Sequence, residues 1–191
     1  MTPPEMAAAF AVVVLVVVIG FIVLSSYNAV VALRQRIDKA WSNIDVVLKQ
    51  RHDQLPNLVA AVRGLMAYER DVLTRVTEAR AAYSPTAPIH TQAATSDVTS
   101  AAVRSLFAVV ERYPDVKAGT NVQDLQDEIE RLEGMIAARR ELYNDQVYRY
   151  NTRISQFPGV MLAPFFGWGP REFFEADPGD TAVPDTDLRS A

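Results

Sequence analysis

The chain opens with an apolar segment that is long enough to cross a membrane. From Met6 to Leu24 it reads MAAAFAVVVLVVVIGFIVL, without a single charge. At about 1.5 Å per residue, a helix of this length spans roughly 28 Å, which matches the hydrocarbon core of a bilayer. Lipid tolerates only a backbone that bonds internally, so a helix forms despite the modest helix propensity of valine. We predict a transmembrane helix at residues 6–24, preceded by a short external N-terminus at residues 1–5.

A cleaved signal peptide is the alternative for this segment. Against it, the leader has no basic side chain, the apolar run exceeds the usual signal-peptide core, and the following SSYNA is a poor cleavage site. A lipid-modified anchor needs a cysteine, and the chain has none. Basic residues resist translocation, and Arg34, Arg36 and Lys39 follow the span while none precedes it. This predicts a retained anchor with the N-terminus outside and the main domain in the cytoplasm.

A long amphipathic pattern follows. The apolar positions step by four and three, which is the seven-residue repeat of packed helices. Pro56 lies inside the pattern and lacks an amide donor, so we predict a helix kink at Pro56. We interpret the segment as one long kinked helix that runs to about Ala82, with two helices broken at Pro56 as the alternative. The repeat comprises Ile37, Trp41, Ile44, Leu48, Arg51, Leu55, Leu58, Val62, Leu65, Glu69, Val72, Val76, Ala79 and Tyr83.

A loop and a shorter helix are expected next. Residues 83–96 contain two prolines and several hydroxyl side chains without a period, which indicates a connecting loop. Ser96 or Asp97 can then cap a helix that runs to Arg112.

A last long helix is predicted from a cap at Asn121 to about Phe157, and it carries a second apolar seam. Two seams of similar period can pack at the shallow angle of an antiparallel bundle. The predicted fold is therefore all-α, with the transmembrane helix followed by an up-and-down antiparallel helical bundle over residues 25–175. Charged residues beside the second seam are expected to face solvent: Asp127, Glu130, Arg131, Glu133 and Arg140.

The C-terminal part changes character. Residues 164–174 read PFFGWGPREFF, too short a pattern for another full-length helix. We expect this aromatic segment to fold over the end of the bundle, or else to contact lipid headgroups. Residues 176–191 are acidic, contain proline and offer little to bury, so we predict a disordered tail.

Composition narrows the function. A net charge of −4 leaves no basic surface for phosphates, so no nucleic-acid partner is expected. Without cysteine there is no thiolate chemistry, and His52 and His90 lack partners at metal-binding spacing. No phosphate-binding glycine loop or nucleophile motif occurs. We therefore expect no metal, no other cofactor and no catalytic residues.

Three charged residues occupy seam positions where a bundle ordinarily places leucine, namely Arg51, Glu69 and Arg139. Buried charge is costly unless it is paired. We interpret the three as part of an internal network of ion pairs and hydrogen bonds that fixes helix register, with Asn57 and Asn144 nearby. The alternative is a polar functional site inside the bundle.

Several blocks of sequence resemble the LemA family of bacterial membrane proteins. Tyr27-Asn28 is followed at residues 33–59 by LRQRIDKAWSNIDVVLKQRHDQLPNLV, and then come VTEAR, ERYPDVKA, RRELYNDQVYRYNTRISQFPG and REFFE in the family's order. The acidic tail departs from the family pattern, as does Val47, where glutamine is frequent.

The resemblance implies one transmembrane helix with a helical bundle behind it, in the inner membrane of a bacterial cell. It implies no established enzymatic activity, and His52 occupies a family-like position without a catalytic role. Some family members are associated with membrane-compartment formation or occur beside genes for membrane proteases.

We therefore expect a membrane-anchored scaffold rather than an enzyme. It would contact the bilayer through residues 6–24 and present a cytoplasmic bundle to protein partners, or to further copies of itself as a homo-oligomer, in membrane organisation. The alternative is a signal-transmitting membrane module in which the helix kinked at Pro56 has two states.

Overall fold

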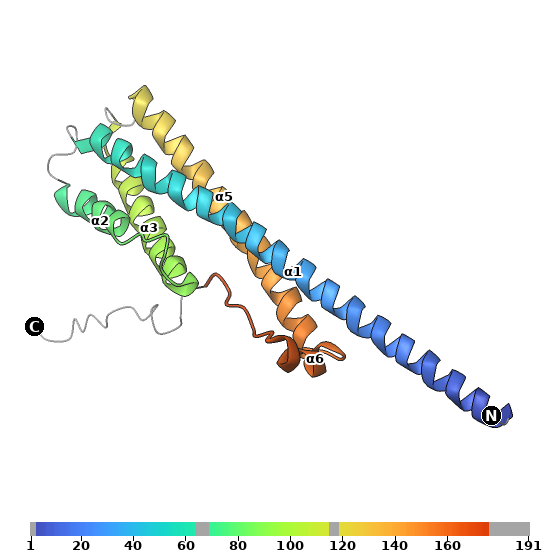
Figure 1. The fold of residues 1–191 in the computed structure, drawn as a ribbon. Helices are drawn as coiled ribbons and strands as arrows, with labels where there is room; N and C mark the ends of the chain where they lie inside the picture. The colour runs from blue at the N-terminus through green and yellow to red at the C-terminus, as the bar shows by residue number, and fades with distance from the viewer. Residues whose placement is uncertain (1–2, 64–68, 115–118, 176–191) are drawn as a thin grey trace, which may run out of the picture. The chain divides into compact units, whose positions relative to one another are not determined.

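The fold is built from helices. The structure is a computed structural model that describes residues 3–63, 69–114 and 119–175, and these contain no strand (Figure 1). The predicted all-α class is confirmed, whereas the predicted tail at residues 176–191 and the first two residues of the N-terminus lie outside the described residues. The helices are α1 (Pro3–Arg63), α2 (Arg70–Ala81), α3 (Ile89–Val110), α5 (Thr120–Ser155) and α6 (Gly159–Phe166).

The chain forms two compact units, and α1 and α5 contribute residues to both. The described part of the first unit consists of residues 3–40 and 144–171. The second unit consists of the described residues between 41 and 143, together with residues 172–175.

The first unit contains the candidate membrane segment. By length and composition the apolar part of α1 can cross a membrane, and none of its most apolar stretch is buried. The unit buries apolar side chains of the rest of α1 and of α5. Tyr150 and Asn151 of α5 also bond the backbone after α6, at Gly169 and Arg171. The core of this unit comprises Val30, Ile37, Ala40, Val147, Tyr150, Ile154 and Trp168.

The second unit is a helical bundle. Helices α2 and α3 lie side by side, and the short connection of residues 82–88 makes them antiparallel (Figure 1). The seam of α1 contributes five buried apolar side chains to this core, namely Ile44, Leu48, Leu55, Leu58 and Val62. The largest fully buried side chains of the unit are Ile44, Leu48, Leu55, Leu58, Leu106, Ile129, Leu132, Tyr143 and Phe174.

The prediction of one long helix to about Ala82 is wrong in its extent. The alternative prediction, of two helices broken at Pro56, is also wrong. Helix α1 stays helical through Pro56 and ends at Arg63, and Glu69 is not helical but directly precedes α2. The seven-residue repeat holds on both sides of the break because both helices bury one stripe of side chains.

The predicted loop at residues 83–96 is also wrong in part. Helix α3 begins at Ile89 after Pro88, so neither Ser96 nor Asp97 is its cap. Its first turns bury Gln92, Ser96 and other polar residues. Because these buried positions are polar, no apolar period marks the start of the helix in the sequence. At the next helix, Asn121 is not the cap either, since α5 already includes Thr120.

The aromatic segment divides between the core and the surface. Trp168 and Phe174 are buried, while Phe165 at the end of α6 is 86% exposed. Trp41 contacts both Tyr143 and Phe174, with ring centroids 5.7 and 5.8 Å apart, so the end of the described chain does cover part of the second unit.

A glycine pair offers a test of the turn between α5 and α6. A Cβ at Gly159 would lie 2.1 Å from the Arg153 carbonyl oxygen, whereas a Cβ at Gly134 would meet nothing within 4 Å. We expect Gly159→Ala to lower the free energy of unfolding by about 1–3 kcal/mol through this overlap with the backbone. Gly134→Ala, inside α5, should instead raise it by about 0.5–1 kcal/mol. Urea unfolding of the full chain in detergent micelles, followed by circular dichroism, measures both, and equal effects would contradict the close approach.

Candidate functional site

A buried arginine forms the most elaborate polar site of the described chain. Arg51 of α1 is 3% exposed. Its Nη1 donates to Glu133 Oε1 at 2.7 Å and to Ser100 Oγ at 2.9 Å, and its Nη2 donates to Ser96 Oγ at 3.0 Å. Ser100 Oγ in turn donates to Glu133 Oε2 at 2.5 Å. We call these four residues, which come from α1, α3 and α5, the Arg51 cluster.

The bonds of the Arg51 cluster join three helices. The Glu133 carboxylate accepts bonds from the guanidinium and from the Ser100 hydroxyl, so both of its oxygens are engaged within the cluster. Among the residues that the structure describes, no group of three or more histidine, aspartate or glutamate side chains is placed to hold a metal ion.

A histidine and a tyrosine lie beside the cluster. The His52 and Tyr83 rings are 5.1 Å apart, and the Tyr83 hydroxyl donates to Asp45 at 3.4 Å. Burial, together with the Asp45 carboxylate, raises the pKa of Tyr83 to about 12. Burial and the neighbouring Arg80 guanidinium lower the pKa of His52 below its usual 6.5. Both aromatic side chains are therefore held in their neutral forms at neutral pH.

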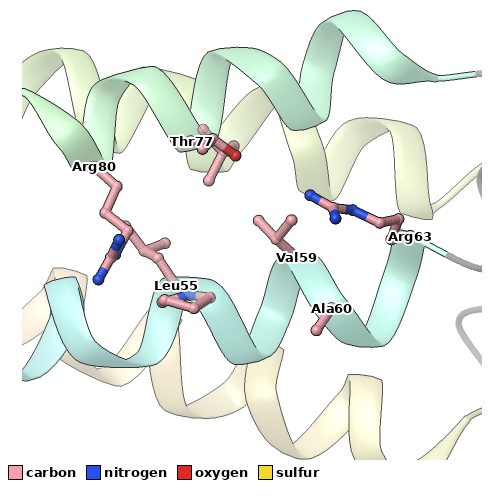
Figure 2. A pocket seen from close by; sticks show the side chains of 8 residues that line it. Leu55, Val59, Ala60, Arg63, Thr77 and Arg80 are labelled. Carbon is pink, nitrogen blue, oxygen red and sulfur yellow. The ribbon is translucent and has the colours of Figure 1, made fainter.

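A groove between α1 and α2 opens next to these residues. Its volume is about 310 Å³, and Figure 2 shows Leu55 and Val59 of α1 facing Thr77 of α2 across it. Arg80 and Arg63 stand at its two ends (Figure 2). Arg80 Nε donates to the His52 carbonyl oxygen at 3.2 Å, which ties α2 to α1. The remaining lining residues are Pro56, Ala60 and Val76.

The structure does not bring the three predicted seam charges together. Glu69 precedes α2 and pairs with Arg112 at 3.4 Å, while accepting a bond from the Tyr113 hydroxyl at 3.2 Å. Arg139 donates to the Asn43 carbonyl oxygen at 2.7 Å. The internal network expected from the sequence therefore forms around Arg51, whereas Glu69 and Arg139 have separate partners.

The other predicted residues lie as follows. Arg36 and Lys39 are exposed on α1 in the first unit, and Arg34 is half-buried. Pro56 is exposed at the groove, and its predicted kink stays a prediction. Asn57 is exposed and bonds Gln54, so it belongs to no buried network.

Sequence reasoning missed Glu133, Ser96 and Ser100. Glu133 was expected on the solvated face, but it pairs with Arg51, and Arg140 likewise pairs with Asp97 at 2.8 Å. The seam position of Arg51 was a signal for such a partner, because a buried arginine requires an acidic side chain from another helix. Several acids of α5 met that requirement, so the sequence did not single out one.

Comparison with known proteins gives the family. The LemA family model matches residues 40–187, which is most of the chain. The chain belongs to the LemA family. The matched region contains the Arg51 cluster and the groove, and it begins after the apolar part of α1.

Curated relatives of this LemA chain include magnetosome proteins. Magnetosome proteins MamQ 1 and MamQ 2 of Paramagnetospirillum magneticum are each 35% identical over 83 residues, and MamQ of Magnetospirillum gryphiswaldense is 32% identical over the same length. The match covers 43% of this chain and 30% of each relative. LemA membership and the exposed apolar helix together fit a membrane-associated helical protein.

The Arg51–Glu133 pair can be tested by one variant that breaks it and a second that replaces both of its charges. Glu133→Gln leaves the buried guanidinium without its counter-charge, so we expect a loss of about 1–3 kcal/mol in the free energy of unfolding. Combining Arg51→Met with Glu133→Leu removes both charges and should recover part of the loss. The control is Glu128→Gln, which breaks an exposed pair with Arg131 and should change nothing measurable. Equal stability of Glu133→Gln and Glu128→Gln in urea unfolding would show that the buried pair is unimportant.

His52 makes stability depend on pH. Its folded-state pKa is below the unfolded value of 6.5, so on acidification the unfolded chain takes up a proton before the folded chain does. Stability is therefore full above pH 6.5 and falls as the pH drops through the window below it. His52→Gln should flatten this fall in urea unfolding measured on either side of that pH. If His90→Gln flattens it instead, the assignment to His52 is wrong.

Proposed function

We propose that this LemA protein is a single-pass membrane scaffold whose helical bundle binds protein partners or further copies of itself. The observation that carries the proposal is the dual character of α1. One continuous helix contains an unburied apolar segment suited to lipid and, further along, the buried seam of the bundle. A bundle built on this helix is tethered to the membrane by its own core.

The charge pattern supports one orientation for this scaffold. Arg34, Arg36 and Lys39 follow the apolar segment, and basic residues are retained on the cytoplasmic side. We therefore place the N-terminus outside the inner membrane and the bundle in the cytoplasm. We propose that the scaffold acts by binding rather than by catalysis, because the four residues of the Arg51 cluster bond to one another within the bundle.

A role in membrane organisation fits the comparisons. Magnetosome proteins are among the relatives that are similar to this chain over 83 residues, and the resemblance to the LemA family implies that some members are associated with membrane-compartment formation. The bundle offers exposed apolar side chains on three helices, which are candidate contact points: Val46 of α1, Val98 of α3 and Leu142 of α5.

Crosslinking in native membranes tests the scaffold. The chain has no cysteine, so a single cysteine at residue 46, 98 or 142 carries a benzophenone maleimide at one known place. We expect adducts of higher mass from at least one of these positions, because a binding surface excludes water around apolar groups. Asp124→Cys, at an exposed polar position of α5, is the matched control. Recovery of monomer alone at every position and every expression level would contradict the proposal.

The same variants report the orientation. Val98→Cys should react with a membrane-impermeant maleimide only after the inner membrane is opened, whereas Thr2→Cys should react in intact cells whose outer barrier is permeabilised. Reaction of Val98→Cys in such intact cells would reverse the orientation.

A signal-transmitting module is the second candidate, and the groove beside Pro56 favours it. Pro56 removes one backbone bond of α1 where α1 and α2 enclose about 310 Å³ of open space, which gives the two helices room for a second arrangement. Adding Pro56→Ala to the crosslinking variants separates the two candidates. An unchanged adduct pattern favours the scaffold, and a changed pattern favours the module.

A further inference from the structure

A second apolar segment lies exposed in the first unit. From Phe157 to Pro170 the chain reads FPGVMLAPFFGWGP, without a charged, amide or hydroxyl side chain. Within α6, four exposed residues fall at the spacing of one helix face: Val160, Met161, Pro164 and Phe165. Phe165 is 86% and Met161 63% exposed, and Phe157 just before the helix is 75% exposed.

This clustering separates α6 from ordinary surface residues. Among the described residues of the second unit, the large apolar side chains that are half exposed or more occur singly, on different helices, and scattered residues of that kind need no partner. Around α6 they are neighbours on a short helix. A contiguous apolar face of this kind marks a contact surface.

The position of α6 identifies what covers that face. Tyr27 of α1 contacts Phe166 at a centroid distance of 5.1 Å and Trp168 at 6.1 Å, and Phe166 stacks on Trp168 at 5.0 Å. Tyr27 follows Leu24, the last residue of the apolar segment, by three positions, which is about 5 Å along a helix. The end of α6 is therefore held beside the membrane boundary of α1.

The chain is bonded so that α6 stays at this level. The Tyr150 hydroxyl donates to the Gly169 carbonyl oxygen at 3.1 Å. Asn151 exchanges two bonds with the backbone of Arg171, at 2.8 and 2.9 Å. Gly167, with φ of +62°, ends α6 in a left-handed turn that returns the chain to Trp168. These contacts all lie within the first unit.

We propose that α6 is a second membrane contact, lying in the interface of the same bilayer that residues 6–24 span. Met161 and Phe165 enter the boundary between headgroups and acyl chains, where amphipathic helices bury their apolar face by about 5–10 Å. Tyr27 and Trp168 take the headgroup level that amphipathic aromatic rings prefer. The inference rests on the proposed transmembrane span, because that span sets the height of Tyr27.

A second copy of the chain is the competing occupant, and continuity with the span favours lipid. Once residues 6–24 are inserted, the residues next to Tyr27 are already at the bilayer surface. An apolar face at that height contacts lipid without any further partner.

Lipid-based quenching tests the contact on the full chain in vesicles of phosphatidylcholine and phosphatidylglycerol. Phe165→Cys, Val98→Cys and Val14→Cys each carry one environment-sensitive NBD fluorophore in a chain that has no other cysteine. Residue 165 is on α6, residue 98 is an exposed apolar position on α3, and residue 14 is in the apolar segment. Nitroxide lipids labelled near the headgroup or near the acyl-chain end supply the depth.

We expect a blue shift and loss of fluorescence at residue 165 with the shallow nitroxide, loss at residue 14 with the deep nitroxide, and no loss at residue 98 with either nitroxide. Quenching at residue 14 without quenching at residue 165 would overturn the α6 contact and leave the span intact. A blue shift at residue 165 without quenching by lipid would also overturn it, and would indicate a second copy. Absence of quenching at residue 14 would overturn the span and the inference that rests on it.

Discussion

The buried guanidinium of Arg51 is the constraint on which the arrangement of the second unit depends. A charge that is 3% exposed is tolerable only if each face of it meets an acceptor. Glu133 supplies the counter-charge from α5, and Ser96 and Ser100 supply oxygens from α3. Because bonds to a planar guanidinium are directional, sliding any one of the three helices by a turn would leave the charge unpaired. Apolar seams alone would resist such a slide only weakly.

This constraint explains the composition of α3. A helix that faces an arginine must give up apolar residues on its inner face, and α3 buries Ser96, Thr99 and Gln92 there. Gln92 donates to the carbonyl oxygens of Pro85 and Ala87, so it also holds the connection that leads into the helix. Polar burial in this bundle therefore has two uses, which are pairing Arg51 and fixing the turn between α2 and α3.

Features that depend on local periodicity could be predicted from the sequence. Features that depend on a contact with a residue far away in the chain could not. The all-α class, the stripe from Ile44 to Val62 and the stop after α5 all follow from spacing and punctuation within one segment. The start of α3 was missed because its buried face is polar there. Gln92 holds the connection from α2, and Ser96 bonds Arg51, a residue 45 positions away from it. Glu133 was assigned to solvent for the same reason, since nothing local distinguishes it from Glu130.

The break after Arg63 shows a different limit. A seven-residue repeat records which side chains are buried but not whether one helix or two bury them, so Val62 and Val76 fit one pattern although they belong to α1 and α2. Glu69 shows this limit most clearly, because it fits the seven-residue spacing although it lies outside the helices. Its carboxylate pairs with Arg112 and Tyr113 near the end of α3, which couples the start of α2 to the helix that follows it.

The distribution of apolar surface links the fold to the membrane. The second unit buries its long apolar stripes and pairs its buried arginine, as a domain in water must. The first unit leaves two uncharged segments uncovered, at residues 6–24 and around α6, and Tyr27 brings the end of one beside the end of the other. A solvent of water alone would penalise both segments, whereas a bilayer and its interface accommodate both. The two units therefore follow different rules of burial within one chain. In the proposed scaffold, α1 is common to both because a tether has to be continuous with the domain that it holds.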